Sequence, residues 1–254
     1  MDNLFWYSET SIIVLLGLPT LAYMVYSYRR NAPPIQNLSE TISNYSLFNS
    51  LYSIFLSMAL VTLLVNFNTV QDDTRKESEA IVSTARLLNG ITDARPMQQA
   101  LATYAKAVVE DDLPAMQAGK MSPRAAAAFD GLWNAAYAIK LGSKNEENIH
   151  RLVLGNLEDI TKSRLTRRIK AKENLHPMIF TLIVLGYYVM LIKTWLTRVA
   201  NRKTQLAFEL PMFVIIILVI TVIVDLNTPF VGIVNIDTTT FDYALQRATA
   251  LAGN

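Results

Sequence analysis

The chain has 254 residues, of which 52% are hydrophobic and 17% are charged, and this composition is apolar and charge-poor for a soluble protein of its size. Its net charge of +2 is too small to indicate nucleic-acid binding, and the absence of cysteine excludes disulfides, thiolate nucleophiles and cysteine metal sites. Residues 68–176 contain 16 of the 23 lysines and arginines and 14 of the 21 acidic residues. The rest of the chain is therefore mostly compatible with hydrocarbon.

Four stretches are long and apolar enough to cross a bilayer as helices, because a hydrocarbon core of about 30 Å needs roughly 20 residues. In chain order they are residues 10–28, 47–67, 178–195 and 206–226. The segment before the first stretch is acidic and aromatic rather than basic. It therefore lacks the start of a signal peptide, and we expect the first stretch to be retained as a span.

The spans form two predicted hairpins with a polar insertion between them. We predict a first transmembrane hairpin at 1–67, a water-facing helical domain at 68–176, a second hairpin at 177–226, and a carboxy-terminal turn and short helix at 227–254. The insertion has apolar residues at helical spacing, which predicts a bundle of four helices. The predicted fold class is all-α: an integral membrane protein with four transmembrane helices and an inserted helical-bundle domain.

Local signals place the helices of the insertion. No strong breaker separates residues 70–88 from the second span, so we expect one long helix to leave the membrane. Ser122 is the predicted cap of a later helix, with Pro123 at its first position. Trp133 and Leu152 are predicted to face the bundle core. The acidic run 110–112 is interpreted as a solvated helix end rather than a paired-carboxylate site.

The second span carries a stripe of polar and then apolar residues on one face. Its members recur at three- and four-residue spacing: Ser46, Asn49, Ser50, Ser53, Ser57, Leu60, Val61 and Leu64. Hydroxyls and amides can replace part of an ion's hydration, and an apolar ring can gate by dewetting, so these residues are pore-lining candidates. Small residues at this spacing also favour close packing of membrane helices, and both interpretations stay open.

Several segments resemble the bestrophin-like membrane proteins, a family of unknown function. An Asp that ends the last span and a Pro-Phe-x-Gly turn are typical of that family, and here they are Asp225, Pro229, Phe230 and Gly232. Asp225 is expected to accept hydrogen bonds from the amides of that turn. Further matches are Glu79 after the second span, Tyr104 in a central helix, and the basic pair Arg164 and Arg167 before the third span. The family usually has Glu-Trp-Pro where this chain has Asp112, Leu113 and Pro114.

The resemblance implies four spans, with a helical domain inserted between the second and the third. It also implies a relationship to bestrophins, which are pentameric ion channels whose second span lines the pore. Animal bestrophins pass anions, and some bacterial relatives prefer cations. Fold likeness alone does not fix function.

A basic cluster precedes the third span: Lys162, Arg164, Arg167, Arg168, Lys170 and Lys172. We interpret it as a solvated helix face that sets topology, with anionic headgroups or a channel mouth as alternatives. Near the span ends, eight basic residues lie on the side of the large domain and five on the other side. The positive-inside rule then predicts a cell-membrane protein with a cytoplasmic domain and cytoplasmic termini. The first span taken alone indicates the opposite orientation, because Asp2 and Glu9 precede it and Arg29 and Arg30 follow it.

Signals for an enzyme are poor, because the chain lacks a phosphate-binding glycine loop, a nucleophile elbow and histidines at metal-ligand spacing. We therefore expect no catalytic residue, no metal and no cofactor. The first hypothesis is a homo-oligomeric ion channel, with the lipid bilayer, inorganic ions and other copies of the chain as partners and no role for nucleic acid. The alternative is a non-conducting membrane scaffold or regulator whose helical domain binds a protein.

Overall fold

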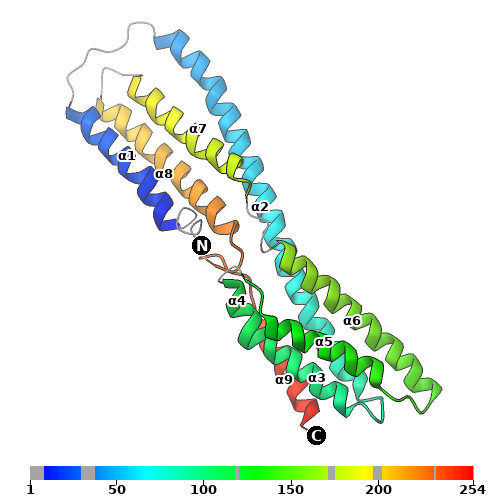
Figure 1. Ribbon diagram of the computed structural model, residues 1–254. Coiled ribbons are helices and arrows are strands. Elements are labelled where there is room, and N and C mark those ends of the chain that lie inside the picture. Colours follow the sequence, from blue (N-terminus) through cyan, green and yellow to red (C-terminus); the bar gives the residue numbers. More distant parts are fainter. Residues whose placement is uncertain are drawn as a thin grey trace. The chain divides into compact units, whose positions relative to one another are not determined.

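The computed structural model describes residues 9–29, 38–117, 120–170, 175–196, 202–231 and 233–253. Every regular element in these residues is a helix, which confirms the predicted all-α class. Figure 1 shows the chain coloured by residue number. The chain divides into two compact units. Unit 1 comprises Met1–Val65 and Asn174–Thr228, and unit 2 comprises Asn66–Glu173 and Pro229–Asn254.

The longest element is α2, a single helix over Leu38–Leu88. Its 51 residues correspond to about 75 Å of helix at 1.5 Å per residue. No proline or glycine occurs within it, so nothing in its sequence breaks the backbone hydrogen bonding. The expectation of one long helix is confirmed, and α2 supplies residues to both units.

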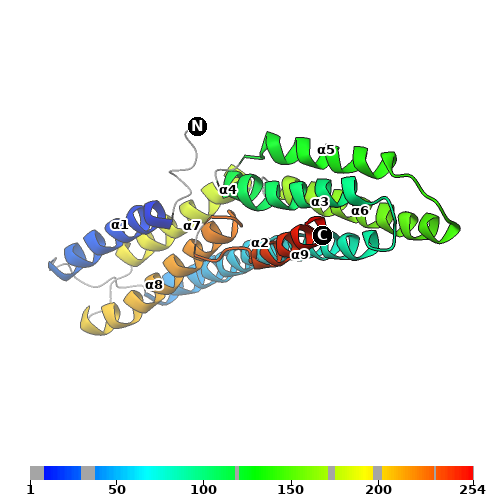
Figure 2. The same cartoon turned by 90° about the horizontal axis from the view of Figure 1, so that it is seen from below.

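Unit 1 contains α1 (Glu9–Arg29), α7 (Pro177–Leu196), α8 (Arg202–Leu226) and the first part of α2. In Figures 1 and 2 α1 lies beside α8. Tyr187 of α7 joins these helices, because its ring packs edge-on against Phe213 and its hydroxyl donates a 3.2 Å bond to the Leu16 carbonyl. Tyr188 similarly bonds the Leu15 carbonyl at 2.9 Å. The hydroxyls of these two tyrosines are thus paired, as hydrocarbon surroundings require.

The outer faces of unit 1 are apolar. Large hydrophobic side chains on all four of its helices are exposed, among them Leu18, Ile54, Leu185, Phe208 and Ile215. A soluble protein rarely exposes so continuous an apolar surface, whereas a membrane protein presents one to lipid. Within the described residues, three helical stretches are long and apolar enough to span a bilayer: Ser46–Leu88, Pro177–Thr194 and Lys203–Leu226.

The fourth predicted span corresponds to α1. Its apolar part in the described residues is the shorter stretch Thr10–Tyr26, so the predicted count of four spans is not reached by length and composition alone. Tyr23 nevertheless ties α1 to both neighbouring helices. Its hydroxyl lies 3.0 Å from the Thr194 carbonyl and 3.4 Å from a carboxylate oxygen of Glu209.

Unit 2 is a helical bundle with a shared apolar core. Its elements are the remainder of α2, α3 (Arg95–Ala107), the π-helical turn η2 (Val108–Asp112), α4 (Leu113–Gln117), α5 (Pro123–Ala138), α6 (Lys144–Lys170) and α9 (Thr239–Ala252). The short carboxy-terminal helix α9 packs against α3 and buries Phe241, Ala244 and Ala248 in that core. The carboxy-terminal segment therefore belongs to the bundle.

One detail of the predicted bundle is wrong and two agree with the structure. Leu152 is predicted to face the core but is 59% exposed, because α6 turns Val153 and Leu157 inward. Trp133 is half-buried and packs against the core, and its ring is tilted against that of Tyr137. The predicted helix cap is present, since the Ser122 hydroxyl accepts a 3.3 Å bond from the Ala125 amide.

Candidate functional site

The stripe on α2 lies on a face that unit 1 leaves largely uncovered. Among its members, Asn49 and Leu60 are half-buried and the other six are exposed: Ser46, Ser50, Ser53, Ser57, Val61 and Leu64. The sequence placed these residues on one face, and the helix over Leu38–Leu88 has the geometry that this spacing needs.

The hydroxyls of the stripe bond within their own helix. Ser50 donates to the Ser46 carbonyl, Ser53 to that of Asn49 and Ser57 to that of Ser53, at 2.8–2.9 Å. Each hydroxyl proton is thereby occupied, while the oxygen keeps lone pairs for an outside donor or cation. The carbonyl oxygen of the Asn49 amide is buried and has no hydrogen-bond partner among the described residues.

A neighbouring face of α2, about 100° around the helix from the stripe, makes the contacts within unit 1. Tyr52, Leu56 and Leu63 are buried, and the Tyr52 hydroxyl donates a 2.7 Å bond to the Ile183 carbonyl of α7. Gly186 permits this approach, because a Cβ atom there would lie 2.6 Å from Cδ2 of Tyr52. Packing inside the chain therefore uses the face with Tyr52, and the polar stripe remains available to a pore or to another copy.

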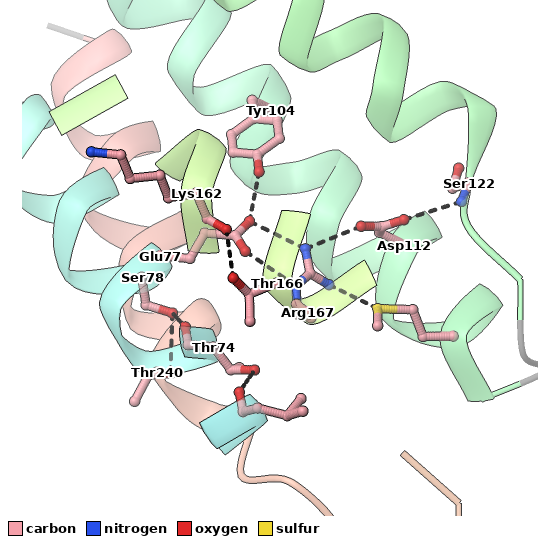
Figure 3. Close-up of polar contacts among 12 residues, drawn as sticks. Thr74, Glu77, Ser78, Tyr104, Asp112, Ser122, Lys162, Thr166, Arg167 and Thr240 are labelled. Carbon is pink, nitrogen blue, oxygen red and sulfur yellow. Dashed lines mark hydrogen bonds and ion pairs between the residues drawn. The ribbon is translucent and has the colours of Figure 1, made fainter. Parts of the chain in front are cut away.

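A second polar feature lies inside unit 2, where one arginine meets two carboxylates. The Nε of Arg167 donates to Oε2 of Glu77 at 3.1 Å, and Nη2 donates to Oε1 of Glu77 at 3.2 Å and to Oδ2 of Asp112 at 3.1 Å. All three side chains are fully buried. Figure 3 shows Glu77 and Asp112 on either side of the guanidinium.

Neutral groups complete the hydrogen bonding of this buried cluster, which we define as Glu77, Tyr104, Asp112 and Arg167. The Tyr104 hydroxyl donates to Oε1 of Glu77 at 2.6 Å, and Oδ1 of Asp112 accepts from the Ser122 amide at 3.1 Å. Nη1 of Arg167 approaches the Met116 sulfur at 2.9 Å. Buried charges are tolerated only when paired and hydrogen-bonded in this way.

The π-helical turn η2 accompanies the inward position of Asp112. A π turn adds a residue to the helical path and shifts the faces of everything that follows. Here Glu110 remains exposed and Asp111 is half-buried, while Asp112 is fully buried. The interpretation of residues 110–112 as a solvated helix end is therefore wrong for Asp112, because the arginine of α6 compensates its buried charge.

The buried cluster perturbs the protonation of its members. Burial, followed by the nearby Glu77 carboxylate, raises the pKa of Tyr104 well above its ordinary value, so this phenol stays a donor. Burial acts to lower the pKa of Arg167, but the charges of Glu77, Tyr104 and Asp112 outweigh it and the pKa is raised. The guanidinium is therefore a permanent cation that joins α2, η2 and α6.

Each arginine of the family pair, Arg164 and Arg167, lies near one aromatic ring. The Arg167 guanidinium lies 5.6 Å from the ring centroid of Phe241 in α9, and that of Arg164 lies 5.1 Å from the ring of Phe129 in α5. Cations favour such positions over ring faces. The pair thus packs against α5 and α9.

The basic cluster before the third span is not one solvated face. Arg167 is fully buried, Arg164 and Lys170 are half-buried, and Lys162 and Arg168 are exposed. Lys162 pairs with Glu158 at 2.9 Å, and Lys172 lies outside the described residues. Our interpretation was wrong for Arg167 because that position continues the buried face of Val153, Leu157 and Ile160.

The family positions Glu79 and Asp225 differ in burial. Glu79 is exposed and pairs with Arg75 at 2.9 Å, whereas Glu77, which we missed, carries the buried charge. Asp225 is buried, and its backbone carbonyl accepts a 3.1 Å bond from the Thr228 amide.

After this turn, the Pro229 carbonyl accepts from the Ile236 amide at 3.1 Å, and Phe230 is buried. Gly232 lies outside the described residues.

The apolar outer faces of unit 1 and the three stretches long enough to cross a bilayer indicate an integral membrane protein, and every regular element of the described residues is helical. The sequence profile of the bestrophin-like domain matches residues 17–241. The chain belongs to the bestrophin-like family. No curated protein matches it significantly.

Solved structures share this fold at low sequence identity. One is a membrane protein with a glycine-to-alanine substitution, with a TM-score of 0.71, 14% identity and coverage of 96% of this chain and 99% of that chain. Another is a bacterial bestrophin homologue from Klebsiella pneumoniae with a tryptophan-to-alanine substitution, with a TM-score of 0.67, 12% identity and coverage of 96% and 98%. Both likenesses extend over nearly the whole chain and concern the fold.

Proposed function

We propose that this chain forms a homo-oligomeric ion channel whose pore is lined by the stripe on α2. The observation that carries the proposal is the division of α2 into two faces. Tyr52, Leu56 and Leu63 pack within the chain, while Ser53 and Ser57 are exposed on a helix of a membrane protein. The hydroxyl oxygens keep lone pairs that lipid cannot bond, and an aqueous path shared by several copies would hydrate them.

The proposal includes four spans, with α1 as the first. Support comes from the bonds of Tyr23 to Thr194 and Glu209, and of Tyr187 and Tyr188 to the backbone of α1. These bonds join α1 to α7 and α8, so we expect α1 to lie at the same depth in the bilayer as those two helices. Hydrogen bonds are also stronger where water is excluded. Family membership supports the same count and a pentameric assembly.

Planar-bilayer recordings test the conduction. Purified wild-type oligomer is expected to give unitary currents, and Ser53→Leu and Ser57→Leu are expected to reduce them, because leucine removes the lone pairs and narrows the path. Thr62→Leu is the matched control: Thr62 is also exposed and bonds the Met58 carbonyl at 2.8 Å, but lies on a different face. Silent bilayers with folded oligomer, or equal effects of all three variants, would contradict the pore assignment.

The mass of the detergent-solubilised particle tests the assembly separately. A ring of about five copies supports a shared pore. A monomer eliminates it, because one polar stripe on one helix cannot enclose a water-filled path.

A scaffold or regulatory protein is the second candidate, and one observation favours it. Tyr137 is 71% exposed on α5 and stacks on Trp133 at a 5.5 Å centroid distance. Aromatic residues are enriched where protein partners bind. Capture of a defined partner that is lost in Tyr137→Ser, together with absent currents, would favour this candidate over the channel.

We also propose that unit 2 lies in the cytoplasm, on the basis of the eight basic residues near its span ends against five on the other side. The chain has no cysteine, so single cysteines report topology without background. In intact cells, an impermeant maleimide is expected to label Lys203→Cys and to spare Lys140→Cys until the cells are opened. The reverse pattern would invert the orientation.

A further inference from the structure

A groove between α2 and α9 in unit 2 is unconnected with the polar stripe. Its volume is about 530 Å³, within the range of small-molecule sites. One wall is apolar, formed by Val82 and the ring of Tyr243, and hydroxyls of Ser83, Thr239 and Thr240 line the rest. Such a mixture of one flat apolar surface and several hydroxyls suits an organic ligand that itself carries hydroxyl groups.

Two arginines from different helices meet at the Tyr243 side chain, which lines this groove: Arg86 is itself a lining residue, and Arg247 reaches the groove through its contact with Tyr243. Nε of Arg247 donates a 3.0 Å bond to the Tyr243 hydroxyl oxygen, and its guanidinium lies 5.4 Å from the ring centroid. Arg86 of α2 lines the groove, and its positive charge interacts with the same Tyr243 hydroxyl. The hydrogen bond from Arg247 and the charges of both arginines lower the pKa of Tyr243. The Tyr243 hydroxyl oxygen accepts the hydrogen bond from Arg247, so its own proton remains free to be donated to a ligand.

The positive charge of this pair is not neutralised inside the protein. No carboxylate lies within ion-pair distance of Arg86 or Arg247 among the residues that the structure describes. Glu79 also lines the groove, but it pairs with Arg75, and its Cα lies two helical turns, about 10 Å, before that of Arg86. Tyr243 therefore lies beside two uncompensated cations, of which Arg86 lines the groove and Arg247 contacts the tyrosine.

We propose that the α2–α9 groove binds a phosphomonoester of a hydroxylated small molecule, with its phosphate on Arg86, Arg247 and the Tyr243 hydroxyl. Two guanidiniums balance the charge of a phosphate dianion and match its oxygens with forked donors. The groove is too large for inorganic phosphate alone. The organic part would lie along Val82 and the hydroxyls of Ser83 and Thr240.

Calorimetric titration of the full chain in detergent tests this site. Ribose 5-phosphate and adenosine monophosphate are the probes, and adenosine, which lacks the phosphate, is the matched ligand control. We expect saturable binding of both esters with one site per chain and none of adenosine. Arg86→Gln and Arg247→Gln are each expected to weaken binding by about tenfold or more, and Tyr243→Phe to weaken it less, because the ring stays.

Arg151→Gln is the matched protein control, since Arg151 is an exposed arginine of α6 outside the groove. Each variant must keep the wild-type melting temperature and particle mass, which excludes misfolding as the cause. A short-chain phosphatidic acid, which carries the same phosphomonoester, forms another arm, and tighter binding of it than of ribose 5-phosphate would assign the site to a lipid headgroup and overturn the small-molecule part.

Failure of both esters to bind at millimolar concentration would overturn the whole proposal, and so would equal losses in Arg151→Gln and Arg86→Gln. Binding of inorganic phosphate as tight as that of both esters would overturn the organic part. Neither result depends on conduction, because the measurement records heat of binding rather than current.

Discussion

Nε of Arg167 lies 3.1 Å from Oε2 of Glu77, 90 positions earlier in the chain, and neither side chain is accessible to water. The bond joins α6 to α2 in the interior of unit 2. Asp112 approaches the same guanidinium from η2 at 3.1 Å. One arginine thus compensates two buried acids, and the ion pairs make α2, η2 and α6 depend on one another.

Removal of the cation is expected to destabilise unit 2 strongly. Arg167→Met keeps much of the volume but leaves two buried carboxylates without their partner, which costs about 3–5 kcal/mol. The free energy of unfolding in mixed micelles measures this loss. Arg168→Gln changes the exposed neighbouring arginine and is expected to alter the free energy by less than about 0.5 kcal/mol. Equal effects of the two variants would contradict the buried pairing.

The inward position of Asp112 gives a second prediction. Asp112→Asn is expected to lower the free energy of unfolding by about 1–3 kcal/mol, because it weakens charged bonds to Arg167 and to the Ser122 amide. Asp111→Asn is the matched control, since Asp111 is half-buried and its pairing with Arg124, at 3.4 Å, is mostly exposed. Urea titration of both variants compares them, and a larger loss in Asp111→Asn would refute the placement.

The third prediction concerns the contact between α2 and α7. Gly186→Ala places a methyl group 2.6 Å from Cδ2 of Tyr52, so the helices must separate or the ring must move. Such overpacking costs about 1–3 kcal/mol. Gly17→Ala, in α1, meets no atom within 4 Å and is expected to be neutral or slightly stabilising. Thermal melting of the two variants in the same detergent distinguishes them.

The fourth prediction concerns acid stability through Glu146. Its carboxylate accepts bonds from the Thr92 hydroxyl at 2.6 Å, the Gly142 amide at 2.6 Å and the Thr92 amide at 3.0 Å, and these lower its pKa from 4.5 to about 2. Because the folded pKa is depressed, the stabilisation is complete above the unfolded value and disappears as pH falls from about 4.5 to about 2.

Melting temperatures of wild type and Glu146→Gln should therefore differ by a constant amount near neutral pH and converge across that acidic window. Glu147→Gln, an exposed neighbour, provides the control. A difference that persists unchanged to pH 2 would show that the bonds of Glu146 act without its charge.

Much of the architecture follows from local sequence. Apolar runs of about 20 residues require a bilayer, and the uninterrupted helix-forming sequence from the second span to Leu88 predicts the continuity of α2. Ser122 caps α5 as expected because a cap depends only on residues three positions apart. The stripe on α2 could also be read directly, since helical spacing defines a face.

The family resemblance named Tyr104 and Arg167, but their pairing with Glu77 and Asp112 was missed because these residues lie far apart in the chain. A signal was nevertheless present: Glu77 shares the helical face of Val70, Ile81 and Leu88, and Arg167 continues that of Leu157 and Ile160. Asp112 offered no such signal. The run of three acids does not distinguish its members, and a π turn changes the spacing on which a face is predicted.

The serine hydroxyls of α2 have a mechanical consequence. Ser50, Ser53 and Ser57 each bond a carbonyl four residues earlier, so that oxygen is shared between a main-chain amide and a side chain. Sharing weakens the main-chain bond and lets a helix bend. Thr74, Ser78 and Thr84 repeat the arrangement further along. A helix with neither proline nor glycine is thereby given elasticity at defined points, which allows it to flex and recover without a permanent kink.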